Sequence, residues 1–95
     1  MQISEVHERI DKIRDALAWS LHYNEVLSVG ERMLMNQERA MWLRELEWKG
    51  MNPDHLIRPG YRVPKKIEEK IRFVTGEIQR TGWNREEYEQ KVVTT

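Results

Sequence analysis

The segment from Ser28 to Gly50 constrains the fold most strongly, because its apolar residues fall on two separate faces of a predicted helix. At about 100° per residue, these faces are rotated by roughly 120° from one another. They consist of Leu34, Met41 and Trp48 on one side and Met35, Trp42 and Leu46 on the other. A surface helix has one apolar stripe, so a helix with two is usually packed on two sides. We therefore expect a helix over about 29–49 that is central in the fold or also contacts another subunit.

The ends of this helix carry signals of their own. Ser28 followed by Glu31 has the spacing of a capping box, in which each side chain accepts a hydrogen bond from a free backbone N–H group. Gly50 suits the left-handed position just past a helix, and Lys49 suits the negative end of the helix dipole. The sequence thus predicts a helix that begins after Ser28 and ends just before Gly50.

A first helix is predicted over about 4–23, with Ser4 as its N-cap. Its apolar residues recur every three or four positions and form one narrow aliphatic stripe. They are Ile3, Val6, Ile10, Ile13, Leu17 and Leu21. Trp19 and Tyr23 lie one turn apart and nearly opposite this stripe. They either pack on another element of the same chain or form a partner surface, because aromatic anchors are enriched in interfaces.

The segment over 50–64 is predicted to be an irregular connector inside the domain. Pro59 and Gly60 mark a turn within it. Pro64 marks the start of the next helix. We expect this third helix over 65–81.

A short fourth helix is predicted over about 85–92, because Asn84 and Glu87 have the spacing of another helix cap. The predicted fold class is therefore all-α, a small bundle of three main helices and a short C-terminal helix in a single domain over 1–95. The stripes of the three main helices predict one shared core. Its expected members are Ile10, Ile13, Leu17, Leu34, Met41, Ile67, Ile71 and Val74.

Composition narrows the range of functions. The 95 residues carry 16 basic and 16 acidic side chains, so no net charge directs the whole chain to nucleic acid or to a membrane. The absence of cysteine excludes disulfides and thiolate metal sites and fits a cytoplasmic location. No stretch is apolar enough to cross a membrane. The sequence also lacks a phosphate-binding loop, a nucleophile motif and a metalloprotease histidine pair, so we expect no enzyme, no cofactor and no metal.

The apolar faces exceed what one small chain is expected to cover. Oligomerisation is a common way for a small domain to bury such surface, and exposed apolar patches mark interfaces. We therefore expect a homodimer or a higher closed oligomer. Its candidate interface residues are Trp19, Tyr23, Met35, Trp42 and Leu46. In the competing account, the connector over 50–64 folds back, and Leu56, Ile57 and Tyr61 cover the second face of a monomer.

Basic residues are concentrated between His55 and Arg72, where six of them stand against two acidic residues. The candidate nucleic-acid or anion-binding residues are Arg58, Tyr61, Arg62, Lys65, Lys66, Lys70 and Arg72. Basic side chains beside an aromatic ring can contact phosphates and stack on a base. On the predicted helix, however, the lysines alternate with Glu68 and Glu69 and form no purely basic face.

Protein–protein interaction is the function that these observations favour. We expect a small, non-enzymatic accessory or regulatory protein of a bacterium or mobile element, acting as a homo-oligomer with an unidentified protein partner. The alternative is a small nucleic-acid-binding regulator that uses the basic segment from Arg58 to Arg72.

Overall fold

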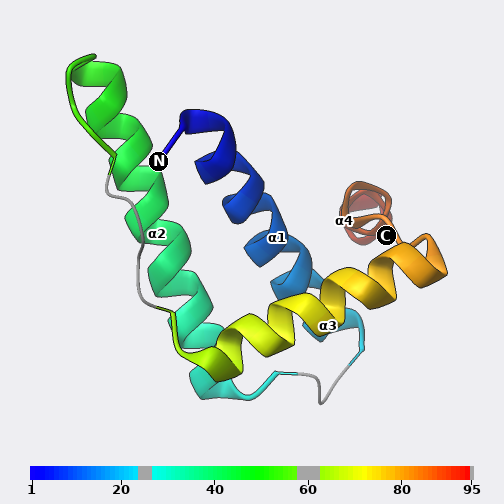
Figure 1. Cartoon of the computed structure of the whole chain (residues 1–95). Helices are drawn as coiled ribbons and strands as arrows, with labels where there is room; N and C mark the ends of the chain where they lie inside the picture. Colours follow the sequence, from blue (N-terminus) through cyan, green and yellow to red (C-terminus); the bar gives the residue numbers. More distant parts are fainter. Residues whose placement is uncertain (24–26, 58–62, 95) are drawn as a thin grey trace.

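The computed structural model describes residues 1–23, 27–57 and 63–94, with the backbone alone for His22 and 91–94. Its helices are α1 (Ile3–His22), α2 (Val29–Met51), α3 (Lys65–Thr81) and α4 (Arg85–Thr94), as Figure 1 shows. Within the described ranges there is no strand. The predicted all-α fold of three long helices and one short helix is confirmed.

The helix around which the others are arranged is α1. In Figure 1, α1 and α2 run side by side in opposite directions, and α3 crosses their lower ends. Among the described residues, α1 contacts α2, α3 and α4, whereas α2 contacts α1 and α3 alone. The prediction that the helix over 29–49 is central is therefore wrong. Its alternative, a helix that also contacts another subunit, stays a prediction.

Side chains on several sides of α1 explain its central place. The predicted stripe is buried at Ile10 and Ile13, and Ala16 is buried beside it. Trp19 is also buried, on the opposite side of the helix. There it packs against Trp83, in the turn between α3 and α4, with 5.5 Å between ring centroids in an edge-to-face arrangement. Of the two alternatives for Trp19, the structure therefore shows packing within its own chain.

Five of the eight predicted core residues are buried. These are Ile10, Ile13, Ile67, Ile71 and Val74. Leu17 and Met41 are partly buried and pack against the core. The prediction for Leu34 is wrong, because its side chain is 40% exposed. Leu34 lies about 80–100° around α2 from the buried Met35 and Trp42. Its side chain is therefore at the edge of the side that faces α1, where α1 covers it only in part.

The predicted capping box of Ser28 and Glu31 is confirmed in full, and the predicted cap of Asn84 before Glu87 is confirmed for the asparagine side chain. The Glu31 N–H donates to Ser28 Oγ at 3.1 Å, and the Ser28 N–H donates to Glu31 Oε1 at 2.9 Å. Before α4, Asn84 Oδ1 accepts a hydrogen bond from the backbone N–H of Glu87 at 3.3 Å. These caps fix where α2 and α4 begin.

Two other predicted helix ends are wrong. Ser4 lies inside α1, whose N-cap is Gln2. The second helix does not end before Gly50 but continues through it to Met51. A residue that precedes proline is pushed out of the helical region, and Asn52, which precedes Pro53, is extended with φ −133° and ψ 97°. Pro53, rather than Gly50, therefore sets the end of α2.

The connector covers the core only in part. Ile57 is buried and belongs to the core, and Val63 is partly buried against it. Leu56, in contrast, is exposed. The predicted turn at Pro59 and Gly60 lies outside the described residues, as does Tyr61.

Candidate interaction surface

The inner face of α2, which consists of Glu31, Met35, Glu38, Trp42 and Glu45, carries three buried glutamates. The glutamates are seven residues apart, about two helical turns, and therefore lie along one side of the helix. Their exposed fractions are 6%, 2% and 5%. A carboxylate is costly to bury unless it is paired and hydrogen-bonded. Each of the three therefore requires partners from its surroundings.

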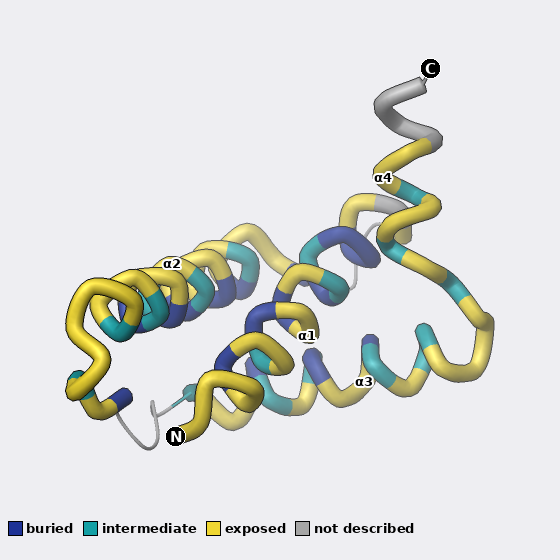
Figure 2. Tube along the Cα trace, turned by 90° about the horizontal axis from the view of Figure 1, so that it is seen from above, coloured by how far each residue is buried: buried dark blue, intermediate teal, exposed yellow. Residues whose placement is uncertain are grey.

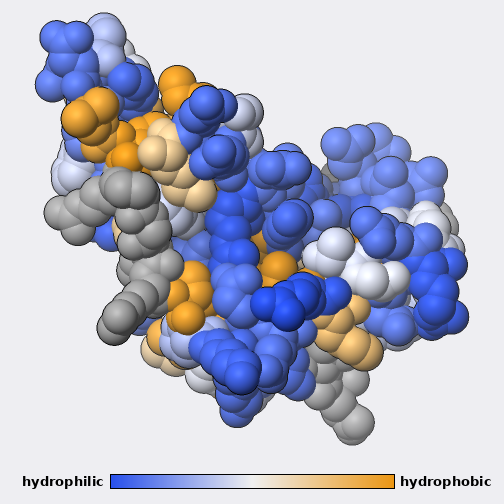
Figure 3. Space-filling view, viewed as in Figure 1, coloured by the Kyte–Doolittle hydropathy of each residue, from blue (hydrophilic) through white to orange (hydrophobic). Residues whose placement is uncertain are grey.

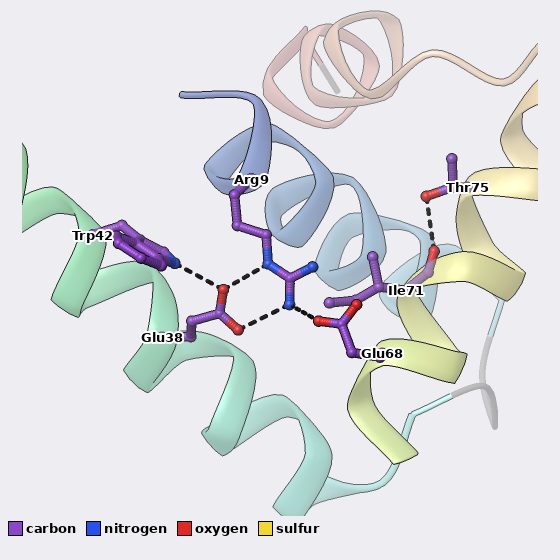
Figure 4. Close-up of polar contacts among 6 residues, drawn as sticks. All are labelled: Arg9, Glu38, Trp42, Glu68, Ile71 and Thr75. Atoms are coloured by element: carbon purple, nitrogen blue, oxygen red, sulfur yellow. Dashed lines mark hydrogen bonds and ion pairs between the residues drawn. The ribbon is translucent and has the colours of Figure 1, made fainter. Parts of the chain in front are cut away.

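Glu38 is paired in a network that joins three helices (Figure 4). Arg9 of α1 donates to both carboxylate oxygens, from Nε to Oε2 at 2.7 Å and from Nη2 to Oε1 at 3.0 Å. Trp42 Nε1 donates to Oε2 at 2.8 Å, and Arg9 also donates to Glu68 of α3. Burial disfavours the charge on Arg9, but its hydrogen bonds to Glu38 and Glu68 outweigh burial and raise its pKa. The network therefore ties α1, α2 and α3 together.

Glu31 and Glu45 have local partners. The hydrogen bond from the Ser28 backbone N–H is the main cause that lowers the pKa of Glu31, and two lysines of α3 add to this effect. The second oxygen of Glu31, Oε2, is buried without a hydrogen-bond partner among the described residues. Glu45 Oε2 lies 2.5 Å from Nε2 of His55, in the segment that follows α2. The His55 contact holds that segment against the end of the helix.

The outer face of α2 carries five apolar residues, most of them exposed, and the polar residues Gln37 and Arg44 lie among them. The apolar residues are Met33, Leu34, Met41, Trp48 and Met51. All but the partly buried Met41 are between 40% and 69% exposed. Figure 2 shows that α2 is buried on the side toward α1 and exposed on the far side. In Figure 3, apolar surface gathers over the C-terminal end of α2, at the upper left of the view.

A groove lies at the N-terminal end of the outer face, where α2 meets the start of α3. Its walls include Met33, Leu34, Gln37, Pro64, Lys66 and Ile67. Glu31, whose Oε2 has no hydrogen-bond partner among the described residues, also lines the groove. The groove therefore combines an apolar lining with one cationic side chain and one carboxylate.

The predicted interface residues differ in burial. Trp19, Met35 and Trp42 are buried in the core of their own chain, so the expectation that they remain uncovered is wrong. Leu46 is partly buried against the same core. Tyr23 remains exposed, and its ring lies beside that of Trp19 with 4.3 Å between the centroids. The packing of α1 and α3 covers the inner face, so the exposed apolar residues of α2 are those of its outer face together with Val29 and Leu43.

The predicted nucleic-acid residues are also divided. Arg58, Tyr61 and Arg62 lie outside the described residues. On α3, Lys66 and Lys70 act on the carboxylate of Glu31 and thus face α2. Lys65 and Arg72 are exposed and lie on another side of the helix. The described basic residues therefore do not share one surface, and nucleic-acid binding stays a prediction.

The sequence analysis did not identify the buried glutamates. A signal was present, because Glu31, Glu38 and Glu45 recur every seven residues on the side that also carries Met35 and Trp42. A charged residue at each repeat of an apolar stripe predicts a partner from another element. Arg9, one of those partners, gave no comparable signal, since it is one of many basic residues on α1 and α3.

Comparisons of the chain with known protein families, with curated proteins and with solved structures find no match. No helix in the described part of the chain has the length and apolar character needed to cross a membrane. In the same part, no group of three or more His, Cys, Asp or Glu residues is arranged to hold a metal ion.

Proposed function

We propose that this protein is a small non-enzymatic interaction module that forms a homo-oligomer through the outer face of α2. The single observation that carries the proposal is the exposure of four large apolar side chains of α2 that do not belong to the core. They are Met33, Leu34, Trp48 and Met51. Contiguous exposed apolar side chains usually mark interaction surfaces. Tryptophan and methionine are also enriched in interfaces relative to the rest of protein surfaces.

A second copy of the chain is the favoured partner. A small domain buries only a modest fraction of its surface, and oligomerisation is a common way to cover more. Among soluble oligomers, closed symmetric homo-oligomers are the most frequent kind. An accessory or regulatory role is compatible with such a module, because an exposed apolar surface can bind another protein.

Two leucines on opposite sides of α2 provide a matched test. Leu34 and Leu43 are 40% and 46% exposed and lie about 180° apart around the helix. We expect Leu34→Glu to dissociate the oligomer, because a buried unpaired carboxylate is costly, and Leu43→Glu to leave it intact. Sedimentation equilibrium should give a multiple of 11.5 kDa for the wild type and for Leu43→Glu, and 11.5 kDa for Leu34→Glu.

Circular dichroism should show that both variants keep the helical content of the wild type, because neither leucine belongs to the buried core. A wild-type chain that sediments at 11.5 kDa would contradict the proposal. Equal dissociation by the two substitutions would also contradict it, because the effect would then not be specific to the outer face.

A further inference from the structure

The fourth helix differs from the other three in the way it is held. Helices α1, α2 and α3, which we call the three-helix body, each bury apolar side chains in the common core. None of the described side chains of α4 is buried, and among the described residues α4 contacts α1 alone. Figure 2 shows α4 extending away from the three-helix body. Burial of apolar surface, the main force that holds helices together, therefore contributes little to the position of α4.

The contacts that hold α4 converge on Arg85, its first residue. Arg85 Nη1 donates to Asp15 Oδ1 at 2.9 Å and to the backbone oxygen of Asp11 at 3.3 Å, both on α1. The Arg85 side chain is 13% exposed, so these contacts are partly shielded from solvent. A cation is unfavourable at the N-terminus of a helix, because the helix dipole is positive there. The contribution of Arg85 therefore lies in its contacts with α1.

The packing around these contacts is open. A cavity of about 340 Å³ lies between α1 and the start of α4, and its lining includes Asp11, Asp15, Arg85 and Glu86. Trp83, in the turn before α4, packs against the core and therefore belongs to the three-helix body. Tyr88 of α4 lies beside it, with 5.8 Å between the ring centroids. One aromatic contact and one set of ion pairs thus join α4 to the body.

We propose that α4 is a detachable arm, which leaves α1 while the three-helix body stays folded, and that the ion pairs of Arg85 set how often it does so. Local openings of this kind occur in segments with few buried apolar contacts. An isolated helix shorter than about 12–15 residues is marginal in water, so the ten-residue α4 unwinds once it leaves α1. An opening exposes Asp11 and Asp15 of α1 and the side of the Trp83 ring that faces Tyr88. The proposal concerns a single chain and does not rest on the oligomer.

Hydrogen exchange of the full chain tests whether α4 opens separately. The backbone N–H groups over 88–94 exchange only when α4 unwinds, because helical hydrogen bonds shield them. We expect them to be protected less than the core amides of α1 and α3, and to open with a smaller dependence on urea, since less surface is exposed. Equal protection and equal urea dependence would show that α4 opens only when the body unfolds. Absence of protection would show that α4 does not dock. Either result would overturn the proposal.

Two arginines provide a matched pair of variants. Arg85→Gln removes the ion pairs with α1, whereas Arg80→Gln removes an ion pair between Arg80 and Glu77 within α3, where Arg80 is 69% exposed. We expect Arg85→Gln to raise the exchange rates over 88–94 about tenfold, because hydrogen bonds between charged groups are lost. Arg80→Gln should leave these rates unchanged. Removal of a cation from the helix N-terminus would by itself slow exchange, so a faster rate reports the lost contacts with α1. Equal rates in the two variants would overturn the role of Arg85.

Salt provides an independent readout of the same ion pairs. Asp11 and Asp15 are 63% and 36% exposed, and ion pairs near the surface weaken as ionic strength rises. We expect the amides over 88–94 of the wild type and of Arg80→Gln to exchange faster in about 0.5 M than in about 0.05 M sodium chloride. Arg85→Gln should lose most of this dependence. A salt effect of the same size in Arg85→Gln would show that other contacts hold α4 and would overturn the proposal.

Discussion

The two faces of α2 reverse the usual distribution of residue types. The inner face buries Glu31, Glu38 and Glu45, whereas the outer face exposes Leu34 and Trp48. Lysine, glutamate and aspartate are rarely fully buried in proteins unless they are paired. On this helix, a glutamate is buried where it has a hydrogen-bond partner. Each inner carboxylate has one, either from another element or from the helix's own cap.

The comparison also separates two kinds of contribution to the fold. The inner face contributes both apolar area and a set of fixed polar contacts, in which Arg9 joins Glu38 to Glu68. A buried ion pair adds little net stability compared with apolar residues of the same volume, but removal of one partner is strongly destabilising. Apart from Met41, which packs against the core, the outer face contributes neither to the core nor to such a network, so substitutions of its exposed residues should affect association rather than folding.

The largest effect is expected from Glu38→Ala. This change leaves Arg9 without its bidentate partner and leaves the Trp42 N–H without its acceptor. Breaking a buried ion pair in this way costs about 3–5 kcal/mol of the free energy of unfolding. Urea denaturation is the measurement, and Glu47→Ala, an exposed glutamate of the same helix, is the control with an expected change below about 0.5 kcal/mol. A loss of similar size in both variants would show that Glu38 has no special role.

The next effect compares two methionines on opposite faces. Met35 is 0% exposed and Met33 is 58% exposed. Met35→Ala should lower the free energy of unfolding by about 2–5 kcal/mol, because it leaves a cavity in the core. Met33→Ala should change it by less than about 0.5 kcal/mol when the protein is too dilute to associate. Comparable losses for the two would contradict the assignment of inner and outer faces.

The smallest effect concerns the pH dependence of the cap at Glu31. Hydrogen bonds from Ser28 lower the pKa of Glu31 below the ordinary value of 4.5, so the unfolded state binds the proton more tightly than the folded state. The resulting stabilisation is fully present above pH 4.5 and is lost as the pH falls through the lower folded pKa. Thermal unfolding of the wild type and of Glu31→Gln should differ at neutral pH and converge in acid. A difference that stays constant with pH would mean that the carboxylate charge does not contribute.

Local signals made much of the fold predictable. The start of α2 follows from Ser28 and Glu31, and the start of α4 follows from Asn84, because a cap depends on atoms only two or three residues apart. The end of α2 was predicted at Gly50 but depends on Pro53, a local effect that outweighs the preference of glycine. The candidate surface was not predicted. Leu34 and Trp48 were identified as one of two apolar faces, but the interface was assigned to the other face, with Met35, Trp42 and Leu46, which the structure packs into or against the core.

The sequence by itself determined the number of helices, most of their boundaries and the presence of two apolar faces on α2, because periodicity and caps are properties of short segments. Only the tertiary structure decided which face is buried. That choice depends on where α1 and α3 bring their side chains, and Arg9 reaches Glu38 across 29 positions of the chain. It also decided that α1 is central, and it left Leu34 and Trp48 exposed on the surface.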